Sequence, residues 1–348
     1  MSRRRVTLRA HGLSLRADVR VLAVLGGLTV ASLAVFTAHV SRGEFQIAAP
    51  DVLAALVGAG DQATSFIVLE LRVPRALVAV LAGAALGVAG AIFQDLARNP
   101  LVSPDVIGIS AGAALAAVAV IVLGDAAGFQ VPLAAITGAV GAGILLYLLA
   151  WRGGVHGYRL VLVGIALAAL FDAGVLWVLA RGRIFEVAQA YVWLVGSLNG
   201  RGWEHVWPLA VVLAVLLPLA LALGRALEML QLGDEVARTL GVRIERARLG
   251  LLAVAVALTA VAVAAAGAIA FVAFIAPHIA RRLGHSVSPV GVLPLSAAAG
   301  ALLLLAADLA GRLLFAPTEI PAGIVTAVLA APYFLYLLHR ANRLGATG

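Results

Sequence analysis

The sequence predicts an all-α membrane protein whose chain crosses the bilayer about ten times. Of its 348 residues, 63% are hydrophobic and 12% are charged, whereas a soluble domain has about 45–50% apolar and about 25% charged residues. A spanning helix needs about 20 apolar residues, so this length has room for about ten helices but not for an added soluble domain. We expect one transmembrane domain over 21–340, between an arginine-rich N-terminus at 1–20 and a tail at 341–348.

The first predicted helix covers residues 21–40 and follows six arginines. A signal peptide has a shorter apolar region and a small-residue cleavage site, and no clear site of that kind follows here. We therefore expect a retained helix that starts in the cytoplasm. The other apolar stretches lie at 76–97, 106–123, 131–151, 158–180, 207–226, 249–265, 267–283, 291–308 and 321–339.

Local residues set the expected boundaries of two of these stretches. Pro74, in Arg72-Val-Pro-Arg75, is well placed to begin the helix at 76–97. Residues 249–283 are almost continuously apolar and too long for one helix. We expect a tight turn near Ala266 and Gly267, with the second helix ending between Pro277 and Arg282.

The distribution of arginine predicts how the helices are threaded. With ten crossings, 18 arginines fall in the termini and connections expected in the cytoplasm and 7 fall outside, as the positive-inside rule requires. An even number of crossings places both termini on the same side of the membrane, and the arginine-rich ends make that the cytoplasmic side. The net charge of +8 is then flanking charge of membrane helices, and we expect no nucleic-acid partner.

Several kinds of chemistry are excluded by the residues that the chain lacks. There is no cysteine and no lysine, so neither a phosphate-binding loop of the G-x-x-x-x-G-K-[ST] type nor a Schiff base can form. No H-E-x-x-H or G-x-S-x-G motif occurs. His278 has no second histidine or carboxylate at helical spacing, so we expect no metal site. Because none of these motifs is present, we also expect no catalytic residue and no enzymatic activity, and we expect no cofactor.

The connection at 228–241 mixes apolar and charged residues in a predicted cytoplasmic loop. Gly233 and Asp234 can end one short helix and cap the next. Two short amphipathic helices at a turn could lie on the lipid surface or dock a soluble partner. Because the segment lacks an arginine-rich polar face, we favour the partner.

Four charged residues are unusual for their predicted positions. Arg72 and Arg75 lie on the outer side, where arginine is less common; they either snorkel at the interface or dock acidic residues of an external protein, with Arg312 as a third member if the fold brings it near. Asp172 lies inside the apolar stretch 158–180, where a carboxylate needs a partner or water. We expect it to line a wet path or to face another subunit.

Several short sequence strings occur in order along the chain. Together they make residues from about 20 to 340 resemble the FecCD family, the permeases of iron-siderophore, haem and vitamin B12 ABC importers. The strings are Arg72-Val-Pro-Arg75, Gly83-Ala-Ala-Leu-Gly-Val-Ala-Gly-Ala-Ile-Phe-Gln94, Arg98-Asn-Pro-Leu-Val-Ser-Pro104, Gly196-Ser-Leu-Asn199, Leu232-Gly-Asp234, Ala276-Pro-His-Ile-Ala-Arg281, Ala307-Asp308 and Glu319-Ile-Pro-Ala-Gly323. Within the family, the Phe-Gln, Ser-Pro-Asp-Val and Gly-Ser-Leu-Asn strings are most similar to ferric enterobactin permeases. Asp172 departs from the family pattern.

The resemblance implies a type II importer with ten helices per permease, two permease subunits, two cytoplasmic ATPases and an external siderophore-binding protein. It implies a heterodimer with a paralogous permease, docking of the binding protein at Arg72, Arg75 and Arg312, and coupling to the ATPase by 228–241. The coupling residues would be Glu228, Leu230, Leu232, Gly233, Asp234, Ala237, Leu240 and Gly241.

The function we expect is therefore ATP-driven import of a ferric siderophore, an enterobactin-like catecholate, with ATP hydrolysed by another chain. The same machine importing haem or a cobalamin is an alternative. An ion-coupled secondary transporter is a rival from another class, but it would need several ionisable residues inside the membrane, and only Asp172 stands clearly within a predicted span.

Overall fold

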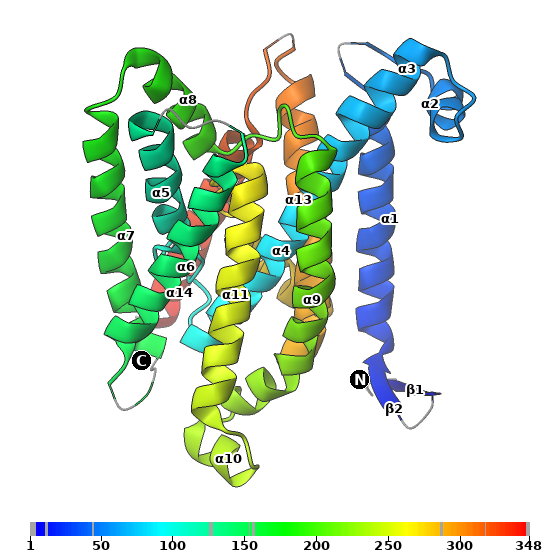
Figure 1. Cartoon of the computed structure of the whole chain (residues 1–348). Helices are drawn as coiled ribbons and strands as arrows, with labels where there is room; N and C mark the ends of the chain where they lie inside the picture. Colours follow the sequence, from blue (N-terminus) through cyan, green and yellow to red (C-terminus); the bar gives the residue numbers. More distant parts are fainter. Residues whose placement is uncertain are drawn as a thin grey trace.

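Helix α4 (Val73–Ala97) lies at the centre of the structure, a computed structural model that describes residues 5–10, 13–43, 45–124, 128–152, 154, 157–285, 288–316 and 318–345. Four helices pack around it (Figure 1): α9 (Trp203–Gln231), α11 (Ile244–Ala266), α12 (Val272–Gly284) and α13 (Pro289–Leu313). Most of its side chains are buried, because its many small residues let the neighbouring helices pack closely around it.

Five further long or apolar helices complete the bundle. They are α1 (Val19–Ser41), α5 (Ile109–Leu123), α6 (Gln130–Ala150), α7 (Gly157–Leu179) and α14 (Ala322–Gly345). α1 and α14 pack on α13, while α5, α6 and α7 pack on one another. In the described residues, these ten helices coincide with the ten apolar stretches of the sequence, and the all-α polytopic fold is confirmed.

Not every one of these helices is long enough to cross a membrane alone. In the described part of the chain, seven helices have the length and composition for it, and the apolar helices Ile109–Leu123 and Ala322–Tyr336 are shorter. α12 has 13 residues. The bundle therefore combines full-length spans with helices that cover only part of the depth.

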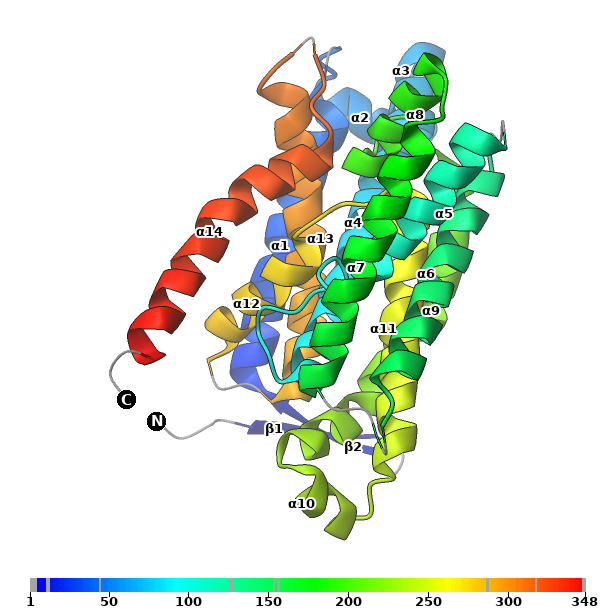
Figure 2. The same ribbon diagram turned by 90° about the vertical axis from the view of Figure 1, so that its left-hand side faces the viewer.

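Short elements mark the two ends of the bundle (Figures 1 and 2). The antiparallel strands β1 (Arg5–Ala10) and β2 (Leu13–Asp18), which the sequence did not predict, lie at the same end as α10 (Asp234–Thr239) and the last turns of α14. We call this the α10 end. The opposite end carries α2 (Ala49–Leu56), α3 (Gln62–Phe66) and α8 (Ile184–Val195), and we call it the α8 end.

One expected helix start and one expected turn are found, each with a difference. Pro74 lies in the first turn of α4, as expected, but the π-helical turn η1 (Ile67–Arg72) joins α4 to α3, so that helical structure runs without a break from Gln62 to Ala97. The wide π turn accommodates a residue that has no N–H to donate. α11 ends at Ala266, and Gly267 has φ +80°, but the chain becomes helical again only at Val272 and continues through Pro277 to Gly284.

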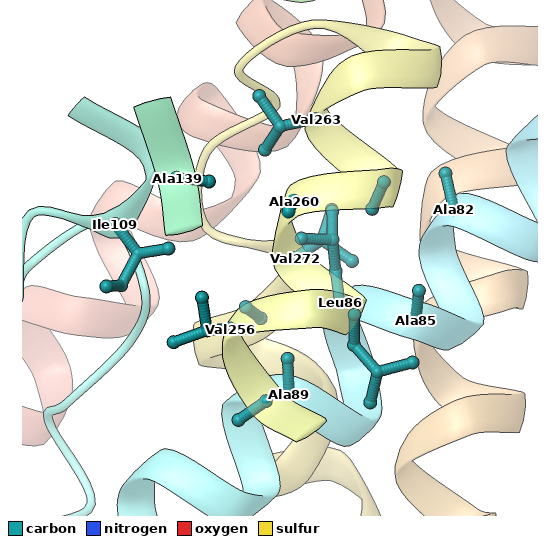
Figure 3. Packing of buried hydrophobic residues seen from close by; sticks show 14 of the residues in the cluster. Ala82, Ala85, Leu86, Ala89, Ile109, Ala139, Val256, Ala260, Val263 and Val272 are labelled. Carbon is teal, nitrogen blue, oxygen red and sulfur yellow. The ribbon is translucent and has the colours of Figure 1, made fainter. Parts of the chain in front are cut away.

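Small residues let the central helices approach closely (Figure 3). Ala82, Ala85 and Ala89 of α4 are fully buried in the core that Figure 3 shows against α11. A Cβ atom at Gly83 would overlap the carbonyl oxygen of Gly300 on α13. Since helix association in lipid depends on close packing rather than on expelling water, these residues fix the position of α4.

Candidate functional site

The loop between α9 and α11 projects an exposed apolar patch at the α10 end. Leu232, Val236 and Leu240 are 59%, 45% and 57% exposed. Val236 and Leu240 are one helical turn apart on α10 and its C-cap, and Leu232 precedes the turn at Gly233. Ala237 between them is fully buried against the bundle. We call these three side chains the α10 patch. Exposed apolar side chains in a polar loop are typical of a protein-docking surface.

The α10 patch is fixed rigidly to the rest of the molecule. Gly233 (φ +110°) and Gly241 (φ +83°) make the sharp turns on either side of α10. Asp234 accepts hydrogen bonds from Arg248 of α11 at 2.7 and 3.0 Å. Arg98, at the end of α4, donates to the carbonyl of Leu230 at 2.5 Å and lies 3.7 Å from Asp234. These bonds join the α10 segment to both α4 and α11.

Polar residues from several of the sequence strings meet at this end of α4. Arg281 of α12 donates to Gln94 at 2.5 Å and to Asp95 at 2.9 Å. Gln94 donates to the carbonyl of Phe274 at 3.1 Å, and His278 lies 2.9 Å from the carbonyl of Pro100. The Phe-Gln, Arg-Asn-Pro, Leu-Gly-Asp and Pro-His-Ile-Ala-Arg strings are therefore parts of one cluster that joins α4, α10 and α12.

The three arginines expected to dock a partner come together at the α8 end, but they bond internally. Arg72, Arg75 and Arg312 are 6%, 8% and 8% exposed and line one cavity. Arg72 donates to the carbonyls of Val40 (2.8 Å) and Phe45 (2.5 Å). Arg312 donates to the carbonyls of His39, at 2.6 Å, and Arg42.

Arg75 is held by two carboxylates. Its Nε and Nη2 atoms donate to both oxygens of Asp308 at 2.8 and 2.9 Å, and its Nη1 atom donates to Glu319 at 3.0 Å. His39 Nε2 lies 2.7 Å from Asp308. This network ties α1, α4 and α13 together, and only the carboxylate of Glu319 remains partly accessible to a partner.

Two cavities open at the α8 end and share part of their walls. They have volumes of about 510 and 590 Å³. The residues lining both are Arg75, Asn199, Arg201 and Glu319. Burial lowers the pKa of Arg201, whose Nη1 atom lies 2.9 Å from His205. Both signs of charge therefore line this mouth.

Two non-helical connections meet on the face between α7 and α14 (Figure 2). The half-buried Asp105, in the connection from α4 to α5, accepts hydrogen bonds from the Ser110 hydroxyl at 2.7 Å and from the Phe271 N–H at 3.3 Å. Irregular backbone within a membrane domain is tolerated where it is buried in protein or lines a water-filled cavity.

Asp172 lies exposed on α7, beside the same face. No hydrogen bond or ion pair to it is present in the part of the chain that the structure describes. The neighbouring side chains on its side of the helix are apolar and exposed, as at Ile165 and Leu176. An unpaired carboxylate on such a surface needs a partner chain or water.

Sequence reasoning missed some residues that the structure places in these sites. Val236 completes the α10 patch, and Arg98 and Arg248 hold it. Of the expected residues, Leu230 and Ala237 face the bundle, Leu232 and Leu240 face outward, and Glu228 is half-buried at the end of α9. Among the described residues, no group of three or more histidine, aspartate or glutamate side chains could hold a metal ion.

Comparison with known sequences identifies the family. The sequence model of the FecCD transport family matches residues 30–340. The chain belongs to the FecCD transport family. The ferric enterobactin transport system permease protein FepG of Escherichia coli (strain K12) is 42% identical over 301 residues, covering 86% of this chain and 91% of that protein. The Fe(3+)-citrate import system permease protein YfmE of Bacillus subtilis (strain 168) is 42% identical over 324 residues, covering 93% and 96%.

A solved structure shares the fold of this FecCD-family permease. The inward-facing conformation of a metal-chelate type ABC transporter matches with a TM-score of 0.80 at 27% identity and covers 92% of this chain and 99% of that chain. The chain is a bacterial polytopic membrane permease of an ABC importer for substrates of the iron-siderophore or iron-chelate type. It is a transport component and not an enzyme, and its family works with ATPase and substrate-binding subunits.

Proposed function

We propose that this FecCD-family permease moves a ferric siderophore of the catecholate type into the cytoplasm, as one half of a heterodimer with a related permease. Two copies of a cytoplasmic ATPase would drive it, and an extracytoplasmic binding protein would deliver the substrate. Relatives named for enterobactin and for ferric citrate support an iron chelate as cargo. The enterobactin-like choice rests on the Phe-Gln, Ser-Pro-Asp-Val and Gly-Ser-Leu-Asn strings.

The observation that carries the proposal is the α10 patch and its attachment. A transported ligand with equal affinity for two conformations cannot shift their balance, so the shift must come from another chain. The patch offers that chain an apolar surface, and Arg98 and Arg248 connect it to α4 and α11. The ATPase would contact Leu232, Val236 and Leu240. Gly233, Asp234 and Gly241 would hold the segment in its conformation. Glu228, Leu230 and Ala237 would pack it against the rest of the bundle.

This assignment sets the orientation of the chain. The α10 end would face the cytoplasm, together with the arginine-rich residues 1–20 and the tail at 341–348. Residues 21–340 between them would form a single transmembrane domain. The α8 end would face outward in the plasma membrane. The arginine distribution supports this orientation.

The binding protein would dock at the α8 end. Because Arg72, Arg75 and Arg312 are bonded internally, a glutamate of that protein would have to replace Glu319 at Arg75, and the other two arginines would supply positive potential and hold the loops. Docking of this kind weakens as salt rises. Changing Arg72 and Arg75 together to glutamate should weaken docking and reduce its sensitivity to salt.

The related permease would cover the face between α7 and α14. That face has irregular backbone at Asp105 and Phe271, and α7 at its edge carries the exposed carboxylate of Asp172, which suits a path closed by a second subunit. Replacing Asp172 by asparagine should leave expression intact and alter transport if the residue lines the path. Loss of assembly would place it in the subunit contact.

The experiment that tests the proposal is co-expression of this chain with the neighbouring transporter genes and purification through a tag on this chain alone. A complex with two ATPase copies and one different permease, whose ATPase activity rises with ferric enterobactin and its binding protein, would support the full proposal. Stimulation by ferric citrate but not by ferric enterobactin would overturn the proposal that the cargo is a catecholate. A homodimer would overturn the proposal of a different second permease. A chain that purifies without an ATPase would overturn the coupling role of α10.

A further inference from the structure

A groove of about 370 Å³ opens between α1 and α9, with α4 and α13 forming its floor. Small side chains such as Ala84 and Ala297 make the floor, and Leu25 and Leu221 stand on the two sides. Polar side chains occur in the lining only at Thr29 and Ser32 of α1, and the Thr29 hydroxyl donates to the carbonyl of Leu25 in its own helix. The groove is therefore apolar.

The groove lies at membrane depth. All four helices that line it belong to the segments long and apolar enough to cross a bilayer. Its lining on α4 runs from Val80 to Val88, about 12 Å along the helix axis at 1.5 Å per residue. The apolar lining and the small volume suit a hydrocarbon chain.

An arginine stands at the end of the groove nearest α10. Arg225 follows Leu221 by four residues and so lies on the same side of α9. Its side chain is exposed, and in the described residues it has no hydrogen bond or ion pair, although Glu228 lies one turn further along. Gly224, just before it, faces α13, where a Cβ atom would lie 3.4 Å from Leu293 in the groove wall.

Arg20 of α1 does not share this opening. It precedes Leu25 by five residues, which places it on a different side of α1, and its side chain is bonded to the end of α12: its Nε atom donates to the carbonyl of Leu283 at 3.2 Å, and its Nη2 atom lies 2.8 Å from His285. The apolar groove thus ends near one exposed positive charge, Arg225, at the level where a helix begins or ends, which is where lipid phosphates lie.

We propose that this groove binds an anionic glycerophospholipid, with one acyl chain between α1 and α9 and the phosphate paired with Arg225. A groove open to the bilayer with only two hydroxyl groups in its lining has little to hold water, so hydrocarbon fills it. Arg225 selects the charge of the head group, while the groove itself recognises only the chain. The bound lipid would fill the space between α1 and the rest of the bundle.

The test is native mass spectrometry of the full-length chain in its purified transporter complex, titrated with phosphatidylglycerol or phosphatidylcholine. The expected result is preferential retention of phosphatidylglycerol. Arg225→Gln should reduce that preference about fivefold, as expected for one arginine near an anionic surface. Arg246→Gln is the matched control, because Arg246 is exposed near the same end, on α11, which does not line the groove.

A second variant tests the groove separately from the charge. Ala297→Leu would fill the half-buried floor and should lower retention of both lipids, with Ala84→Leu in its place if that variant fails to assemble. Equal retention of the two lipids by the unmodified complex, or losses equal for Arg225→Gln and Arg246→Gln, would overturn the head-group assignment. Unchanged retention in the filled-groove variants, or a protein chain crosslinked into the groove, would overturn the acyl-chain site.

Discussion

Asp308 shows how one residue can hold three membrane helices together. It lies on α13 and is bonded to Arg75 of α4 and His39 of α1. Removing one partner of a buried ion pair leaves the other charge uncompensated, which costs about 3–5 kcal/mol. We expect Arg75→Met to lower the free energy of unfolding by about that amount, measured by denaturant titration in detergent.

The double variant distinguishes a paired charge from simple loss of packing. Arg75→Met combined with Asp308→Leu should recover much of the loss, because the buried carboxylate that Arg75 neutralises is then absent, while Glu319, the other partner of Arg75, is partly accessible. If the two single-variant losses merely add, the pair does not stabilise the bundle as the distances indicate.

At the scale of the element, the α10 patch is the feature whose removal should separate folding from coupling. Changing Leu232, Val236 and Leu240 to serine removes exposed apolar area and leaves Ala237 and the Asp234 contacts in place. We expect normal expression and a loss of co-purifying ATPase of at least about tenfold, since apolar residues at the centre of an interface carry much of its binding energy.

Leu249→Ser provides the control for this variant. Leu249 is also an exposed leucine near the same end, on α11 and outside the patch. If it loses the ATPase equally, general exposure of apolar surface and not the patch explains the result.

The sequence indicated most of the elements because length and hydropathy determine where a chain can cross a bilayer. It did not indicate where helices are interrupted: the π turn before Arg72 and the non-helical residues 267–271 depend on contacts with distant segments, such as the bond from Phe271 to Asp105. Hydropathy is also insensitive to β1 and β2, which lie outside the membrane spans.

At the scale of the whole molecule, the sequence strings predicted where the candidate sites lie but not which residues from other helices contact them. The α10 segment was found from its mixed pattern, but Arg98 and Arg248 brace it from other helices, and no local pattern could pair them with Asp234. Arg72, Arg75 and Arg312 do come together, but their burial and internal hydrogen bonds follow from the loop at 42–45 and from α13. Side-chain exposure is a property of the assembled bundle.

The orientation of the whole chain can be tested directly, because the protein has no cysteine of its own. Leu232→Cys is exposed at the α10 end and Val57→Cys at the α8 end. A membrane-impermeant thiol reagent added to intact spheroplasts should label Val57→Cys and spare Leu232→Cys, while inverted vesicles should give the opposite pattern. The arginine distribution predicts this result, since positive charge is retained in the cytoplasm during insertion. The reverse labelling would place α10 outside, beyond the reach of a cytoplasmic ATPase, and the coupling role proposed for it would then be wrong.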